Sequence, residues 1–156
     1  MAGVVYNPIM NELFFAAGGK GAYLNGERIT VSRVNNLKRA LLSTGFPYDI
    51  TSNPNNNINH FVNFLHQAQA VRRDGSAALN LSYVACGRFD GFWELRLSPW
   101  DLAAGALILE EAGGRITNLS GGPFTIYHGE CLASNGLIHQ AMAGVIKKGN
   151  GTAGPA

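Results

Sequence analysis

The segment from Leu102 to Ala112 constrains the fold of this chain more than any other. Its sequence, LAAGALILEEA, is apolar on almost every side until Glu110. A helix at the surface of a globular protein has an apolar stripe on one side only, so a helix apolar all round must be buried on more than one side. The sequence therefore predicts that this helix, opened by Asp101 and closed by Gly113-Gly114, forms a middle layer between sheets or other helices.

The bulk properties point to one globular domain in a reducing compartment. A chain of 156 residues is long enough to bury about 68–70% of its unfolded surface. The net charge of +2 is too small to indicate a nucleic-acid or membrane-surface partner, and no apolar run reaches the roughly 18 residues of a membrane span. Cys86 and Cys131 stand in apolar contexts, which predicts free thiols. We therefore expect a cytoplasmic location.

Short strands and turns fill the first part of the chain. Residues 4–6 and 13–16 read as two strands. Asn25-Gly26 stands between residues 22–24 and 28–31, and an Asn-Gly pair between apolar runs is the strongest short hairpin signal. This part of the sequence predicts an antiparallel meander.

Strands and helices alternate in the second part. We expect strands at residues 40–44, 70–72, 91–95, 115–117 and 131–134, and helices at residues 58–69, 76–86, 101–112 and 137–147. Ser76 is a plausible N-cap of the second of these helices, and Gly87 is its stop signal. Hairpins followed by alternating elements indicate a layered α/β (α+β) domain over residues 1–148. Residues 149–156 are expected to be a flexible tail.

Two acids stand where a ligand could reach them. Asp101 lies at a helix N-terminus, where an aspartate is either a cap or a ligand for a cationic group. Glu94 ends an apolar strand, and ligand groups of α/β sheets gather at the carboxyl ends of strands. Glu94 could accept hydrogen bonds from substrate hydroxyls, or it could be an ordinary surface acid.

A third candidate is the helix start at Gly75, Ser76 and Ala77. Free backbone N–H groups at such a start can bind an oxygen-rich ligand, although simple capping explains the same residues. Arg72 and Arg73 precede it and could approach a phosphate or a partner subunit. The four histidines share no metal-binding spacing, and the chain contains no HExxH, CxxC, GxSxG or Walker sequence.

Together these segments resemble one protein family. Trp100-Asp101-x-Ala-Ala-Gly, followed by Glu-Ala-Gly-Gly at 111–114, resembles the C-terminal signature of the inositol monophosphatase family. The resemblance extends over about residues 3–147. The further matching segments, in the order of the family, are residues 4–8, 12–14, 21–26, 73–78 and 92–94.

The resemblance implies a role for each candidate residue. Asp101 matches a catalytic, metal-binding aspartate, and Glu94 matches the glutamate that receives substrate hydroxyls. Gly75, Ser76 and Ala77 match the loop and helix start that touch the substrate. The family hydrolyses small phosphate monoesters with Mg²⁺ and usually forms homodimers. The expected substrate is a small phosphorylated polyol, with inositol monophosphate first among the candidates.

The chain also departs from the family. The other metal ligands of the family are a helical glutamate and a segment Asp-Pro-x-Asp-Gly-Thr or -Ser, and neither is present. The Asp-Gly pairs at 74–75 and 90–91 lack the preceding proline. We therefore expect this chain to be the C-terminal half of such a phosphatase, and we expect it to be inactive when it is assayed alone. Two alternatives stay open: a non-catalytic binding or regulatory relative, and a phosphatase for histidinol phosphate or a sugar phosphate.

Overall fold

A computed structural model describes residues 1–149, and the expected flexible tail therefore falls almost wholly outside the described residues. Short 3₁₀ helices lie at Leu37–Arg39 and Ile126–His128. The strands are β1 (Ala2–Asn7), β2 (Glu12–Ala17), β3 (Gly21–Leu24), β4 (Glu27–Ile29), β5 (Leu41–Thr44), β6 (Ala70–Arg72), β7 (Gly91–Leu95), β8 (Arg115–Thr117) and β9 (Glu130–Ser134). The helices are α1 (Ile58–Leu65), α2 (Ala77–Ala85), α3 (Pro99–Glu111) and α4 (His139–Lys147). The expected meander followed by alternating strands and helices is confirmed.

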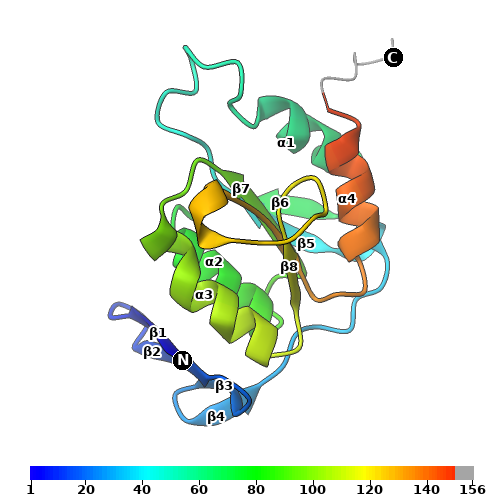
Figure 1. Ribbon diagram of the computed structural model, residues 1–156. Coiled ribbons are helices and arrows are strands. Elements are labelled where there is room, and N and C mark those ends of the chain that lie inside the picture. The colour runs from blue at the N-terminus through cyan, green and yellow to red at the C-terminus, as the bar shows by residue number, and fades with distance from the viewer. Residues whose placement is uncertain (150–156) are drawn as a thin grey trace.

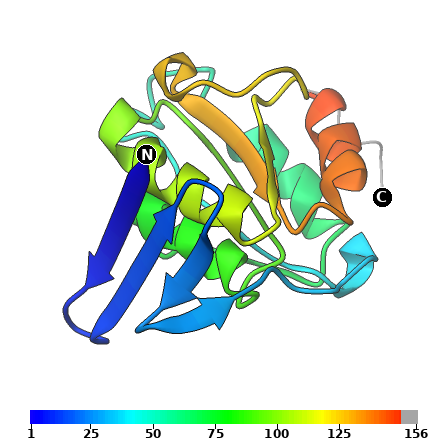
Figure 2. The ribbon, with the colours of Figure 1, turned by 60° about the horizontal axis from the view of Figure 1, so that its bottom comes forward.

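The elements form four layers (Figure 1). An antiparallel sheet in the order β1-β2-β3-β4 packs on α2 and α3, as Figure 2 shows from below. These helices cover one face of a second sheet, ordered β6-β5-β7-β9-β8, and α1 and α4 lie on its other face. The prediction that the apolar helix forms a middle layer is confirmed, because α3 packs against α2 and against strands of both sheets.

Two glycines bring α3 close to its neighbours. A Cβ atom on Gly3 of β1 would lie 3.2 Å from the Cα atom of Ala104. A Cβ atom on Gly105 of α3 would lie 2.8 Å from the Cβ atom of Leu81 in α2. A glycine inside a helix costs about 1 kcal/mol relative to alanine, and here the space it leaves is taken by the neighbouring helix. Both contacts bury the apolar surface of α3.

The second sheet gives Glu94 its orientation. β5 pairs parallel with β6 and β7, and β9 pairs antiparallel with β7 and β8. Successive side chains of a strand point to opposite faces of the sheet. Phe92 belongs to the core on the α2 and α3 side, whereas Trp93 and Leu95 belong to the core on the α1 and α4 side. Glu94 therefore shares the face of Phe92 and lies near the N-termini of α2 and α3.

Three helix boundaries differ from the sequence prediction by two residues or more. α1 ends at Leu65, because the chain must turn to place β6 beside β5, with the N–H of Gln69 donating to the carbonyl of Ala40 (3.1 Å). α3 begins at Pro99 with Ser98 as its N-cap, so Asp101 is the third residue of the helix rather than the first. Proline is preorganised for the first helical position. α4 begins at His139, two residues later than expected.

The outer face of the first sheet is apolar and exposed. Side chains of β1 and β2 alternate between buried and exposed positions, as a half-buried sheet requires. Val5 and Phe14 point inward, whereas Val4, Tyr6 and Phe15 are 53%, 53% and 38% exposed. β1 is also one of the two edge strands of this sheet. Within residues 1–149, no helix is both long and apolar enough to cross a membrane.

A buried histidine makes the stability of this fold sensitive to acid. The ring of His139 is 1% exposed, and its Nδ1 and Nε2 atoms lie 2.9 Å from Ser134 Oγ and 3.1 Å from Thr117 Oγ1. Burial, together with the positive charge of Arg115, lowers the pKa of His139 to about 4. The unfolded chain binds this proton near pH 6.5, so the neutral ring contributes stability above that pH that is lost as the pH falls toward 4.

We predict that His139→Gln flattens this acid response. Between pH 7 and pH 4, His139 should lower the free energy of unfolding by about 3 kcal/mol in the native sequence. Urea denaturation at pH 7, 5.5 and 4 measures the difference between the two proteins, and the exposed His66→Gln serves as the control. An acid dependence identical in His139→Gln and in the unchanged protein would contradict the prediction.

Candidate active site

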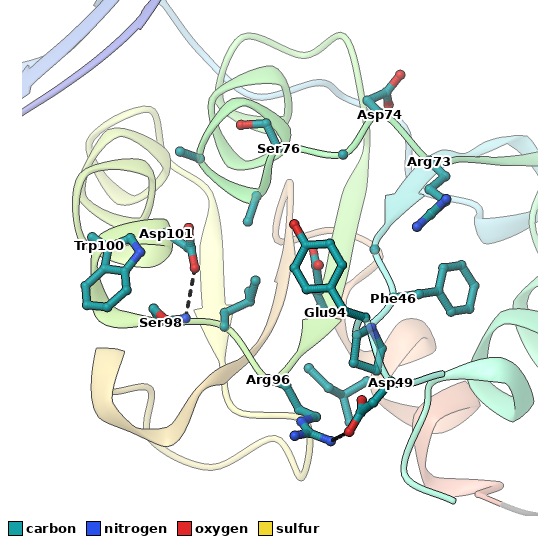
Figure 3. A pocket seen from close by; sticks show the side chains of 18 residues that line it. Phe46, Asp49, Arg73, Asp74, Ser76, Glu94, Arg96, Ser98, Trp100 and Asp101 are labelled. Atoms are coloured by element: carbon teal, nitrogen blue, oxygen red, sulfur yellow. Dashed lines mark hydrogen bonds and ion pairs between the residues drawn. The ribbon is translucent and has the colours of Figure 1, made fainter. Parts of the chain in front are cut away.

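A cavity of about 860 Å³ opens where β5 and β7 end and where α2 and α3 begin (Figure 3). All five site residues predicted from the sequence line it, as does Arg73 but not Arg72. The five are Gly75, Ser76, Ala77, Glu94 and Asp101. Residues from the start of α2, from β7 and from α3 thus meet at one place. Their catalytic and binding roles stay predictions.

Glu94 lies in the wall of the cavity with its carboxylate against the backbone of Gly45. A Cβ atom at position 45 would overlap that carboxylate, so this close approach needs a glycine. Burial raises the pKa of Glu94 to about 7, and the negative charge of Asp101 adds to the rise. The positive charge of Arg73 acts in the opposite direction. At neutral pH the Glu94 carboxyl is therefore divided between its charged and neutral forms.

Asp101 is part of the N-terminal cap of α3. Its Oδ2 atom accepts a hydrogen bond from the backbone N–H of Ser98 at 2.9 Å, drawn as a dashed line in Figure 3. This is the carboxylate arm of a capping box, in which the third helical residue reaches back to the N-cap. The cap interpretation of Asp101 is therefore correct, and its carboxylate still lines the cavity.

The start of α2 forms another part of the wall. The Ser76 hydroxyl accepts from the N–H of Leu79 at 3.4 Å, so Ser76 is the N-cap that the sequence predicted. Gly75 has a φ of +90°, a backbone conformation that other residues rarely adopt. The N–H groups of a first helical turn have no intrahelical acceptor, and the positive end of the helix dipole lies with them. This end of α2 can accept an anion.

The sequence reasoning missed the loop that closes the cavity on the β5 side. Gly45, Phe46, Pro47, Tyr48 and Asp49 line the cavity directly after β5. Their position at the carboxyl end of a strand parallel to β7 was the signal that could have revealed them.

Two arginines hold this loop in place. The Arg73 guanidinium lies 5.5 Å from the centre of the Phe46 ring. The Arg96 guanidinium forms an ion pair with Asp49, with Nη1 and Oδ2 2.7 Å apart. Arg96 has a φ of +61°, unusual for a residue other than glycine. The loop is thus tied to the start of α2 and to the end of β7.

The described residues do not make a magnesium site by themselves. Within residues 1–149, no group of three or more His, Cys, Asp or Glu side chains could hold a metal ion. The Oδ2 atom of Asp101 already accepts a hydrogen bond from the backbone N–H of Ser98. Magnesium takes six oxygen ligands in octahedral geometry, often from one or two carboxylates, water and substrate phosphate. Asp101 could be one such ligand, but the set is incomplete here.

Comparison with known proteins assigns the family. The profile of the Inositol monophosphatase family matches residues 1–149. The chain belongs to the inositol monophosphatase family. The resemblance seen in the sequence is thereby confirmed, and the layered fold agrees with that of solved members of this family.

Three relatives of this inositol monophosphatase family member illustrate the match. Inositol-1-monophosphatase of Synechocystis is 48% identical over 90% of the chain and 49% of the relative. Nus factor SuhB of Escherichia coli K12 is 44% identical over 89% of the chain and 52% of the relative. The structure of inositol monophosphatase from Anabaena superposes with a TM-score of 0.92 and 47% identity, covering 94% of this chain and 58% of that one. The chain thus spans about half the length of the curated relatives it matches.

The two roles of Asp101 can be separated by substitution. Asp101→Ala removes the bond to the Ser98 N–H and should lower the free energy of unfolding by about 1 kcal/mol. Asp101→Asn keeps an oxygen acceptor and should lose less than half of that value. Urea denaturation of both variants measures the cap, with Glu110→Ala near the other end of α3 as the control. An unchanged stability of Asp101→Ala would show that the cap contributes nothing.

Proposed function

We propose that this chain forms the substrate-facing half of a Mg²⁺-dependent phosphomonoesterase, with inositol monophosphate as its substrate. The observation that carries the proposal is that Glu94, Asp101 and the N-terminus of α2 line one cavity in a member of this family. A helix N-terminus favours a phosphate group, and a carboxylate accepts hydrogen bonds from hydroxyls. The cavity therefore offers both halves of a phosphorylated polyol a partner.

Each part of the substrate has a place in this arrangement. The phosphate lies near Gly75, Ser76 and Ala77, where first-turn N–H groups and the helix dipole attract negative charge. The hydroxyls of the polyol donate to Glu94 in its charged form. Since the pKa of Glu94 is near 7, substrate binding at Glu94 weakens as the pH falls below neutrality. Arg73, on the loop side, adds positive charge to the same cavity.

In this proposal, the remaining metal ligands come from outside residues 1–149. Asp101 contributes one carboxylate, and a longer form of the chain or another chain contributes the others. Bound magnesium ions would polarise the phosphate and lower the pKa of the attacking water. Because the set is incomplete within residues 1–149, we assign no catalytic step to this chain alone. The expected homodimer and the cytoplasmic location stay predictions.

The choice of inositol monophosphate rests on the relatives. A protein named inositol-1-monophosphatase is 48% identical to this chain. A hydroxyl-accepting glutamate suits many polyols, so histidinol phosphate and sugar phosphates are the substrates to compare in the same assay. A ratio of kcat/KM that favours one of them over inositol 1-phosphate would replace the substrate and keep the reaction class.

A second candidate is a binding or regulatory protein without catalysis. Two observations favour it: the incomplete metal set in residues 1–149, and a relative at 44% identity that is named a Nus factor. Calorimetry with Mg²⁺ and inositol 1-phosphate on a longer form of the chain separates the candidates, because only a phosphatase completes its metal site there. Tight stoichiometric binding of metal by this chain alone would contradict the non-catalytic alternative.

We predict that the isolated 156 residues release little or no phosphate from inositol 1-phosphate in the presence of Mg²⁺. A longer form that supplies the missing carboxylates should be active, and Asp101→Asn in that form should lower kcat about 100-fold or more. Glu110→Gln, on the exposed end of the same helix, is the matched control and should keep full activity.

Two results would count against this proposal. Robust Mg²⁺-dependent turnover by the 156 residues alone would show that no external ligand is needed. Full activity of the Asp101→Asn variant would remove Asp101 from the metal site. Phosphate release is measured over a range of Mg²⁺ concentrations for each of these two proteins.

A further inference from the structure

A buried asparagine joins the two ends of the loop that faces Glu94. Asn57 is 4% exposed. Its Nδ2 atom donates to Thr44 Oγ1 (2.9 Å) and to the carbonyl oxygen of Gly45 (2.6 Å), and its Oδ1 atom accepts from Trp93 Nε1 (2.7 Å). Both N–H donors and one lone pair of the carboxamide oxygen are therefore used, which is three of the four hydrogen bonds that this side chain can make.

Asn57 gives up an ordinary role to make these bonds. It is the N-cap residue of α1, a position where asparagine normally accepts a hydrogen bond from the first helical turn. Here its side chain makes no such bond, and its φ is +74°. A left-handed backbone conformation is unfavourable for residues other than glycine, although asparagine tolerates it best. The geometry of Asn57 therefore serves the contacts with β5 and β7.

These contacts form a closed hydrogen-bond network of Asn57, Thr44 and Trp93, and Trp93 is the residue that precedes Glu94. The Thr44 hydroxyl donates to the carbonyl oxygen of Trp93 at 2.6 Å, while Asn57 holds the indole of the same residue. Trp93 is fully buried, and its ring stacks on Phe64 with the ring centres 4.0 Å apart. The end of β7 is thereby fixed to the end of β5, one residue before each strand contributes to the cavity wall.

This hydrogen-bond network reaches the Glu94 carboxylate through Gly45. The Gly45 backbone lies directly against the Glu94 carboxylate, and Asn57 holds the Gly45 carbonyl from the other side. The loop that follows supplies Phe46 and Asp49 to the same wall. A shift of Gly45 would let more water reach a carboxylate that is now half-buried.

We propose that Asn57 is a positioning residue of the active site, which holds the Gly45 backbone against Glu94 and so fixes the carboxylate for substrate hydroxyls. The role of Glu94 in this statement rests on the proposed function. The contacts of Asn57 with Thr44, Gly45 and Trp93 do not. Asn57 itself is buried behind the wall and does not touch the substrate.

The charges near Glu94 permit a direct readout of this role. Asp101 raises and Arg73 lowers the pKa of Glu94, and the Asp49–Arg96 pair lies in the adjoining wall. None of these four residues is changed by a substitution at position 57. Burial is the main cause of the raised pKa, so release of Gly45 should move the pKa of Glu94 down toward its ordinary value.

The test is a ¹³C NMR titration of the Glu94 carboxyl in the 156-residue chain and in Asn57→Ala. We expect the pKa in the variant to fall by about one unit, a tenfold weaker hold on the proton. The matched control is Asn135→Ala. Asn135 is also 4% exposed and its Nδ2 atom also donates twice, to Ser32 Oγ (2.9 Å) and to the carbonyl of Val34 (2.7 Å). It does not line the cavity, so the Glu94 pKa should stay unchanged.

An Asn57→Ala protein that folds and titrates at Glu94 like the unchanged chain would overturn the proposal, as would an equal shift in Asn135→Ala. If Asn57→Ala does not fold, Thr44→Val decides, because it removes only the hydroxyl link to Trp93 and Asn57 and keeps the shape of the side chain. A smaller fall in the same direction supports the proposal, and no fall overturns it.

Kinetics then separate this proposal from the proposed function. In a form of the protein that turns over, Asn57→Ala should raise KM for inositol 1-phosphate several-fold more than Asn135→Ala does. If no form hydrolyses a phosphate ester while the Glu94 titration still shifts in Asn57→Ala, the proposed function fails and the positioning role of Asn57 stands. If hydrolysis is normal and the Glu94 titration does not shift in Asn57→Ala, the proposed function stands and the positioning role of Asn57 fails.

Discussion

The structure depends on the burial of α3, a helix without a polar face. Leu102, Ile108 and Leu109 are fully buried, and the helix has to be covered by α2 and by strands of both sheets. That requirement fixes the order of the layers (Figure 1). It also brings the N-termini of α2 and α3 to the same end of the second sheet, where β5 and β7 end. The cavity lies at this end because four elements stop there together.

The polar groups of the cavity have structural roles of their own. Asp101 and Ser76 cap helices, and Gly45 allows a backbone to approach a carboxylate. Capping satisfies backbone groups that would otherwise be unpaired, and both capping residues still line the cavity. Local stability and ligand binding are thus compatible at these positions, and Asn57 supports both from behind the wall.

Local signals in the sequence predicted much of this structure. The Asn25-Gly26 turn, the Ser76 cap and the apolar run after Asp101 each correspond to an observed element, because short-range physics determines them. The end of α1 and the loop at residues 45–49 were not predicted, because they depend on how β6 and β7 pair with β5. The hydrogen-bond network at Asn57 joins residues up to 49 positions apart, and no spacing along the chain marks it.

The close approaches at Gly3 and Gly105 couple distant packing to the geometry of the cavity. These two contacts set how far α3 lies from β1 and from α2. Because a helix moves as one body in a close-packed core, a larger side chain at either contact would push α3, and Asp101 with it, away from β1 or α2. The position of Asp101 in the cavity wall therefore depends in part on side-chain volumes in the core. Enlarging a single methyl-sized contact would alter the cavity without touching any residue that lines it.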